Sequence, residues 1–251
     1  MPSAGSTQKR KQFFSFNKYI WNALDWLYPP SCCSCGRSGV IFCEECQSSI
    51  MKIKGNLCIS CGIHLRKKQT KCVDCLENPP IFREMRSWAV YEGSIREAIH
   101  SLKYKQNIAL GHILAKQLIN VINQSNWKVD LIIPIPLSDS HYKQRGYNQS
   151  ALISRFISKS INIHHSNDAV VRIRDTKTQI SLDIKERFTN LDGAFWGNPA
   201  KLNTRSVLII DDVITTGATM QSCAKEVIDA GAKQVYCLSV ARAVLRTSKQ
   251  K

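Results

Sequence analysis

The sequence predicts an α/β protein in which a parallel-sheet domain follows a small, cysteine-rich double zinc ribbon. Three observations lead to this prediction. Nine of the 11 cysteines lie between Cys32 and Cys75. From about residue 87, apolar strand-like runs alternate with amphipathic helical segments, which favours a parallel sheet wrapped by helices. One apolar run ends in Asp211-Asp212 and a Thr-Thr-Gly loop, a pattern typical of a phosphate-binding turn.

The composition excludes several classes of protein and points to an anionic partner. With 43% hydrophobic residues, 12 Gly and 8 Pro in 251 residues, the chain is neither disordered nor collagen-like. No apolar run reaches the roughly 18 residues of a membrane-spanning helix. The net charge is +16, from 35 Lys+Arg against 19 Asp+Glu, and it is spread along the chain. A basic surface attracts nucleic acid, anionic lipid or small phosphates, although solvated surface charge would explain it equally well.

We expect four segments along the chain. Residues 1–12 form a disordered basic N-terminus, and residues 13–80 hold an amphipathic helix and the cysteine block. The sheet domain covers residues 81–245, and residues 246–251 form a basic tail. The helix follows from an apolar stripe at Ile20, Leu24 and Leu27 that ends at Pro29-Pro30. A signal peptide is disfavoured because polar residues interrupt the segment and no small-residue cleavage site follows.

The cysteine block predicts two structural zinc ions. Each C-x-x-C pair presents two thiolates to one metal, and two pairs complete a closed tetrahedral shell. Sequential pairing needs the shortest loops, and an interleaved cross-brace is the alternative. Disulfides, a redox motif and an iron–sulfur cluster fit a fourfold repeat less well. Cys33 does not fit the C-x-x-C spacing. Cys223 and Cys237 lie within apolar helix and strand patterns, which predicts that they pack in the core. The eight predicted ligands are Cys32, Cys35, Cys43, Cys46, Cys58, Cys61, Cys72 and Cys75.

The elements of the sheet domain follow from periodicity. Residues 87–91, 130–136, 207–211 and 234–240 are compact apolar runs and predict strands. Residues 108–124 and 149–161 carry helical apolar stripes. A helix is also expected near Ala218–Ala230, with Gly231 as its end signal.

The segment VLIIDDVITTGAT, residues 207–219, has the chemistry of a phosphoribosyl site. Backbone N–H groups at a helix start attract an anion, and Gly217 allows a close approach. The carboxylates of Asp211 and Asp212 would repel a phosphate, but they suit sugar hydroxyls or Mg²⁺. A Walker B strand is the competing interpretation, and it fails because the chain contains no Gly-Lys dipeptide.

This segment closely resembles the phosphoribosyl-diphosphate (PRPP) signature of type I phosphoribosyltransferases. Together with residues 99–107, 130–150 and 172–195 and the cysteine block, it resembles the ComF/ComFC family of competence proteins over about residues 17–243. The resemblance implies a type I phosphoribosyltransferase-like domain. It also implies that Asp211 and Asp212 contact ribose hydroxyls, and that a loop holds the 5-phosphate through Thr215, Thr216, Gly217, Ala218 and Thr219.

Positive charge near this loop supplies candidates for holding pyrophosphate or DNA. These are Lys103, Lys105, Arg145 and Arg187, because a leaving pyrophosphate needs cations around it. The alternative for Lys103 and Lys105 is that they are solvent-exposed charges on a helix and bind no ligand. No catalytic residue and no acceptor site can be named, so whether the protein is an enzyme stays open.

The resemblance favours a DNA-uptake factor for natural transformation that handles incoming single-stranded DNA. Cations beside aromatics, as in Lys103-Tyr104-Lys105 and Tyr142-Lys143, suit a single-strand groove. We expect PRPP or a related phosphoribosyl compound, Mg²⁺ with PRPP, and other DNA-uptake proteins as partners. The expected location is the cytoplasm, at the inner membrane only through partners. The alternative is an active phosphoribosyltransferase that transfers from PRPP to an unidentified acceptor and releases pyrophosphate.

Overall fold

The computed structural model describes residues 29–65, 69–174, 191 and 193–243. Several expectations therefore lie outside the described residues. They are the disordered N-terminus (1–12), most of the amphipathic helix (13–28), the candidate Arg187 and the basic tail (246–251).

A five-stranded parallel sheet forms the centre of the molecule, with the strand order β1-β7-β6-β2-β3. Its middle strands are almost wholly buried, because both faces of the sheet are covered. The strands are β1 (Glu84–Val90), β2 (Leu131–Pro134), β3 (His164–His165), β6 (Ser206–Ile214) and β7 (Gln234–Arg242).

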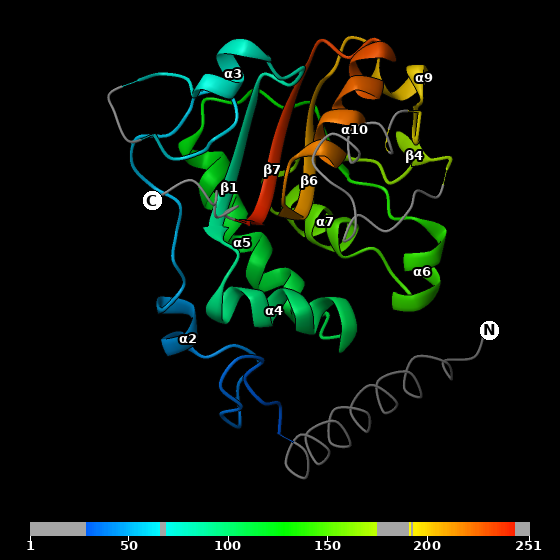
Figure 1. Ribbon diagram of the computed structural model, residues 1–251. Coiled ribbons are helices and arrows are strands. Elements are labelled where there is room, and N and C mark those ends of the chain that lie inside the picture. Colours follow the sequence, from blue (N-terminus) through cyan, green and yellow to red (C-terminus); the bar gives the residue numbers. More distant parts are fainter. Residues whose placement is uncertain (1–28, 66–68, 175–190, 192, 244–251) are drawn as a thin grey trace, which may run out of the picture.

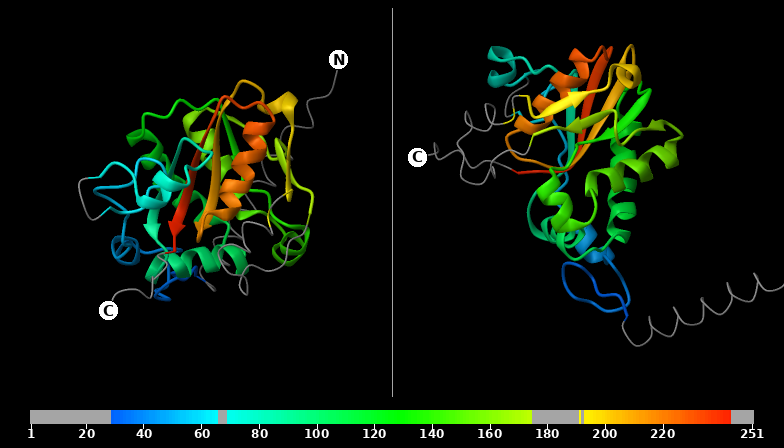
Figure 2. Two further views of the ribbon diagram at one scale, coloured as in Figure 1. Left: turned by 45° about the horizontal axis from the view of Figure 1, so that its top comes forward. Right: turned by 90° about the vertical axis from the view of Figure 1, so that its right-hand side faces the viewer.

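Helices cover both faces of this sheet, as Figures 1 and 2 show. Helices α5 (Ala109–Gln124) and α7 (Gln149–Ile161) pack on one face. Helix α10 (Ala218–Asp229) packs on the other, beside a two-stranded ribbon of β4 (Val170–Arg172) and β5 (Phe195–Gly197). Helix α4 (Gly93–Tyr104) lies across the carboxyl ends of the strands. Two short helices, α6 (Asp139–Arg145) and α9 (Pro199–Leu202), complete this domain among the described residues.

The cysteine block packs along the free edge of the sheet. The chain between its two halves pairs with β1 through Val90 N–H to Met51 O (2.9 Å) and Ile53 N–H to Trp88 O (2.9 Å). Ser60, inside the second half, accepts a hydrogen bond from Met85 N–H (2.7 Å). An unpaired edge strand is open to association with other chains. The block therefore protects β1. Its short helices, α2 (Glu44–Ser48) and α3 (Val73–Glu77), lie near opposite ends of that strand (Figure 1).

Every strand and helix predicted within the sheet domain is confirmed, with small differences at the ends. Gly231 has φ +95° directly after α10, as its role as an end signal requires. The sequence pattern does not predict α4, α6, α9 or the short strands β3, β4 and β5. The two short helices and the three short strands have little stability of their own and depend on tertiary contacts, whereas α4, with 12 residues, is as long as α10.

Candidate functional site

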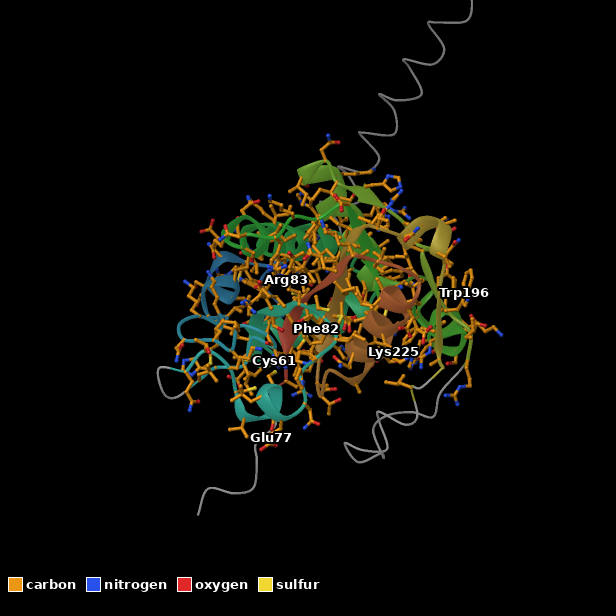
Figure 3. All side chains as sticks on the ribbon, turned by 90° about the horizontal axis from the view of Figure 1, so that it is seen from above. Cys61, Glu77, Phe82, Arg83, Trp196 and Lys225 are labelled. Carbon is orange, nitrogen blue, oxygen red and sulfur yellow. The ribbon has the colours of Figure 1, made fainter. Side chains whose placement is uncertain are left out.

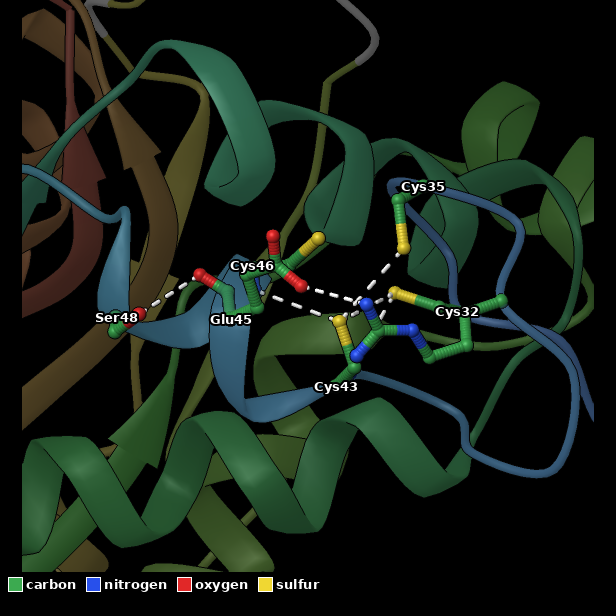
Figure 4. A network of polar contacts seen from close by, with 7 residues as sticks. Cys32, Cys35, Cys43, Glu45, Cys46 and Ser48 are labelled. Carbon is green, nitrogen blue, oxygen red and sulfur yellow. Dashed lines mark hydrogen bonds and ion pairs between the residues drawn. The ribbon is translucent and has the colours of Figure 1, made fainter.

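The eight predicted zinc ligands form two separate four-cysteine clusters. The first cluster contains Cys32, Cys35, Cys43 and Cys46, and the second contains Cys58, Cys61, Cys72 and Cys75. Within each cluster all Sγ atoms lie within 4.8 Å of one another. Figure 4 shows the four cysteines of the first cluster. The grouping is the sequential one, not the cross-brace.

The geometry of both clusters fits a tetrahedral zinc shell. Zn–S bonds of about 2.3 Å place the sulfurs about 3.8 Å apart. The Sγ atoms of Cys32 and Cys43 are 3.7 Å apart, and those of Cys61 and Cys72 are 3.6 Å apart. Gly36 and Gly62 follow two of the C-x-x-C pairs with φ of +76° and +69°, the left-handed turn that glycine permits. The protein therefore has two four-cysteine zinc sites.

Backbone N–H groups favour the thiolate form of one cysteine in each cluster. Burial raises the pKa of Cys32, but hydrogen bonds from the backbone, including Cys43 N–H, outweigh it and lower the pKa to about 6. The pKa of the Cys58 thiol is lowered to about 6 in the same way, and the backbone N–H groups of Cys61 and Cys72 are its main hydrogen-bond donors. Thiolates are the form that binds metal.

The remaining cysteines are placed as the sequence predicts. Cys33 belongs to neither cluster, and burial raises the pKa of its thiol to about 12. Cys223 and Cys237 are fully buried in the core between α10 and the sheet.

The predicted phosphate loop lies between the end of β6 and the start of α10, at the carboxyl edge of the sheet. Gly217 is the N-cap of α10 with φ +85°, so the chain turns through a conformation that favours glycine. A cavity of about 400 Å³, here called the loop pocket, is lined by Tyr91, Lys103, Asp211, Val213, Ile214, Thr215, Gly217, Ala218, Thr219 and Met220. The location agrees with the rule that ligands of open α/β sheets bind beyond the strand carboxyl ends.

The two adjacent aspartates have different surroundings. Asp211 Oδ1 accepts hydrogen bonds from Ser150 Oγ (3.1 Å) and from the Asp212 backbone N–H (2.8 Å). Burial, followed by the neighbouring Asp212 carboxylate, raises the pKa of Asp211 to about 7. Asp212 is only 3% exposed, and its Oδ1 pairs with Lys103 Nζ at 2.7 Å.

Lys103 thus pairs with Asp212 and lines the loop pocket. Burial alone would lower the pKa of its ammonium group, but the Asp212 carboxylate raises it above the usual value. The ammonium group therefore stays charged between the carboxylate and the loop pocket. Lys105 is exposed, follows the end of α4 and does not line the loop pocket.

Arg145 lies nearby, at the end of α6. It is 8% exposed, its Nη2 donates to Tyr104 OH at 3.3 Å, and its guanidinium lies 5.2 Å from the Tyr104 ring centre. Its charge acts to lower the pKa of Lys103, so the two cations are neighbours. Tyr147 OH donates to Leu102 O, which ties the start of α7 to α4.

Sequence reasoning missed Ser150 and Tyr91. Ser150 reaches Asp211 because Asn148 caps α7, accepting from the backbone N–H groups of Ser150 and Ala151. The N-cap pattern is visible in the sequence, but its proximity to β6 depends on the strand order. Nothing in the sequence marks Tyr91, which directly follows β1.

A parallel sheet with this loop at its carboxyl edge, together with two four-cysteine clusters, defines a phosphoribosyltransferase-like protein with a double zinc ribbon. Residues 23–76 match the double zinc ribbon domain family. The chain is 30% identical over 203 residues to the DNA utilization protein YhgH of Escherichia coli K12. The aligned residues cover 78% of this chain and 88% of that protein. It therefore belongs to the ComF/ComFC family of competence proteins.

Two further relatives carry the family's competence names. Competence protein F of Haemophilus influenzae is 30% identical over 208 residues, covering 80% of this chain and 90% of that protein. Competence protein ComFC of Bacillus subtilis is 22% identical over 196 residues, which cover 75% of this chain and 78% of that protein.

Solved structures align with about half of the chain. The adenine phosphoribosyltransferase from Thermoanaerobacter pseudethanolicus has 14% identity and a TM-score of 0.35, with 55% of this chain and 83% of that chain covered. The glutamine PRPP amidotransferase of B. subtilis has 17% identity and a TM-score of 0.35, with 55% of this chain covered. The aligned part spans only 26% of that amidotransferase.

Proposed function

We propose that this protein acts in natural transformation by handling incoming single-stranded DNA in the cytoplasm, and that its loop pocket binds PRPP or a related phosphoribosyl compound. Relatives at 30% and 22% identity are named Competence protein F and Competence protein ComFC, and another is named a DNA utilization protein. Among the described helices, none has both the length and the apolar composition to cross a bilayer. We also propose that the protein meets the inner membrane through other DNA-uptake proteins.

One observation supports the phosphoribosyl ligand most directly. Among the described residues, three buried side-chain atoms have no hydrogen-bond partner: Arg145 Nε, Gln149 Oε1 and Asp212 Oδ2. All three belong to segments at the carboxyl edge of the sheet; none of the three residues lines the loop pocket itself, but Asp212 adjoins Asp211, which does. A buried polar atom without a partner is costly, and a ligand rich in hydroxyl and phosphate oxygens would reduce that cost.

The loop pocket has suitable chemistry for each part of such a ligand. The backbone N–H groups and hydroxyls of Thr215 to Thr219 suit the 5-phosphate, and the aspartates suit the ribose hydroxyls. Of the two aspartates, Asp211 lines the loop pocket, whereas Asp212 does not, and its unpaired carboxylate oxygen is buried. A Mg²⁺ ion or a sugar hydroxyl would therefore meet Asp211 first. When bound with PRPP, Mg²⁺ would supply charge neutralisation for the pyrophosphate.

The same edge suits a DNA strand. Tyr104 and Tyr142 are 50% and 53% exposed, and Lys105 and Lys143 are exposed next to them in the sequence. Exposed aromatics stack with bases, and cations beside them bind phosphates. The segments around Lys103 on α4 and around Tyr142 and Arg145 on α6 come from two parts of the chain, and Arg145 contacts Tyr104.

An active phosphoribosyltransferase is the second candidate function. The observation in its favour is Lys103, a partly buried cation that pairs with Asp212 and lines the loop pocket together with Asp211, where it would stabilise developing negative charge on pyrophosphate. Such an enzyme would displace pyrophosphate from the anomeric carbon of PRPP by an acceptor nucleophile, which no described residue identifies.

A transformation assay in the bacterium that encodes this chain tests the proposal. We expect the Asp211→Ala/Asp212→Ala variant to reduce the number of transformants at least tenfold while the protein level is unchanged. The control is Asp229→Ala, an exposed aspartate paired with Lys225 on α10. Transformation at the wild-type level by the double variant would contradict a role for the loop pocket in DNA handling.

A further inference from the structure

A second cavity lies at the carboxyl edge, on the other side of the start of α7. Its volume is about 520 Å³, within the roughly 300–1,000 Å³ of small-molecule pockets. It is lined by the end of β2, α6, the first turns of α7, and β4. We call it the tyrosine pocket, and its main side chains are Tyr142, Tyr147, Asn148, Leu152, Arg155 and Arg172.

The lining of the tyrosine pocket suits a flat heterocycle. Pro134, Pro136, Leu137 and Leu152 supply an apolar surface. The polar groups come from two amides, two cations and one carboxylate: Asn148, Asn167, Arg155, Arg172 and Asp139. Apolar walls with a small number of polar groups are the usual lining of a site for a planar ligand. A nucleic-acid base has this combination of an apolar face and a polar rim.

The two tyrosines differ in how firmly they are held. Tyr147 is half-buried, and its hydroxyl donates to Leu102 O. Tyr142 is 53% exposed, and its hydroxyl makes no hydrogen bond with a described residue. An aromatic face left open to solvent beside an apolar cavity is what base stacking requires.

The tyrosine pocket and the loop pocket are neighbours through α7. Asn148, the N-cap of α7, lines the tyrosine pocket. Two residues later, Ser150 donates to Asp211 in the loop pocket. Two residues at the start of α7 therefore connect a site suited to a base with a site suited to a sugar phosphate.

We propose that the tyrosine pocket binds a base of single-stranded DNA, stacked on Tyr142, next to the loop pocket. This inference rests on the proposed DNA-handling function and adds the place where a base is held. No bond is made or broken in this step.

The experiment uses a short single strand that carries one 2-aminopurine, whose fluorescence falls when it stacks on an aromatic ring. With the wild-type protein, we expect binding and quenching. Tyr142→Ala should weaken binding on the order of tenfold, consistent with the effect of losing one base stack, and should remove most of the quenching. Tyr142→Phe should keep both, because the ring is retained.

The matched control is Trp196→Ala. Trp196 is 48% exposed on β5, and Figure 3 shows it at the margin of the molecule. It pairs with Val171 of β4, but it lines neither pocket itself. We expect this variant to bind and quench like the wild-type protein.

The possible outcomes separate the inference from the proposed function. Failure of the wild-type protein to bind the strand would reject the proposed function itself. Binding by the wild-type protein with full affinity and quenching in Tyr142→Ala would reject the tyrosine pocket alone. Free 2-aminopurine nucleoside that binds as tightly as the strand would show that the pocket takes a free base, and would overturn the assignment to DNA.

Discussion

Asp211 and Asp212 are adjacent in the chain, yet their surroundings give them different properties. Asp211 is held by Ser150 and by the Asp212 backbone, and its pKa of about 7 leaves it partly protonated near neutral pH. Asp212 forms an ion pair with Lys103. The sequence predicts both as sugar or Mg²⁺ ligands, but it does not predict these partners, because residues 103 and 150 reach the site only through the folded sheet.

The ion pair of Lys103 with Asp212 allows a direct test of ligand binding. We expect Asp212→Asn to weaken PRPP binding at least tenfold, because the change removes the carboxylate while leaving Lys103 with an amide. Calorimetry with PRPP and Mg²⁺ measures the affinity. Asp229→Asn, on the exposed surface, should bind as the wild type does, and equal affinity in Asp212→Asn would reject the assigned role.

His165 gives a prediction for pH. Burial, followed by the charge of Arg155, lowers its pKa below the usual value of 6.5, and Ser154 Oγ lies 2.9 Å from its Nε2. The unfolded chain therefore binds more protons at this group near pH 6, so stability falls as the pH drops below about 6.5.

We expect His165→Gln to lose less stability than the wild-type protein between about pH 7 and pH 5. Denaturant unfolding at the two pH values measures the difference. An identical loss in both proteins would show that His165 does not contribute to the acid sensitivity.

The cysteine block shows what the sequence can predict about an element and what it cannot. C-x-x-C spacing predicts the ligands and the metal, because local chain geometry determines which thiols can meet. It does not predict that the chain between the clusters pairs with β1. That contact depends on β1 being an edge strand, which only the strand order reveals.

Zinc content tests the assignment of ligands and of Cys33. Wild-type protein should carry about two zinc ions per chain, at four thiolates per ion. Cys43→Ser should carry about one, because Cys43 belongs to the first cluster. Cys33→Ser should keep two, and metal analysis of the purified proteins decides between these results. Loss of zinc in Cys33→Ser would contradict the grouping.

Close packing of two elements makes Gly197 on β5 sensitive to substitution. A Cβ atom there would lie 2.7 Å from Glu226 O and 2.9 Å from Ala230 Cβ. At Gly111 on α5 the nearest atom, at 2.7 Å, belongs to the flexible side chain of Leu152.

Gly197→Ala should therefore lower the free energy of unfolding by about 1–3 kcal/mol, because the backbone at Glu226 or at residue 197 would have to move. We expect Gly111→Ala to cost less, since a side chain can rotate. Denaturant titration of both variants checks the order, and a larger loss in Gly111→Ala would contradict it.

At the scale of the whole molecule, alternating strands and helices predict the parallel sheet, and the Asp-Asp and Thr-Thr-Gly residues predict the phosphate loop. The sequence does not predict that α4, α6 and α7 converge beside the loop, since their contacts join residues about 40 positions apart, such as Arg145 with Tyr104. The net charge of +16 is spread along the chain. It therefore supports an anionic partner but does not show where on the surface that partner binds.

The binding of single-stranded DNA as a function of salt tests the central claim most directly. If the strand contacts about four phosphates, affinity should fall roughly 50-fold between about 50 and 200 mM salt, because each contact contributes about 0.7 to the logarithmic slope. Fluorescence anisotropy with a labelled strand measures this dependence. Absence of binding, or an affinity that does not change with salt, would contradict the account of this protein as a DNA-handling factor.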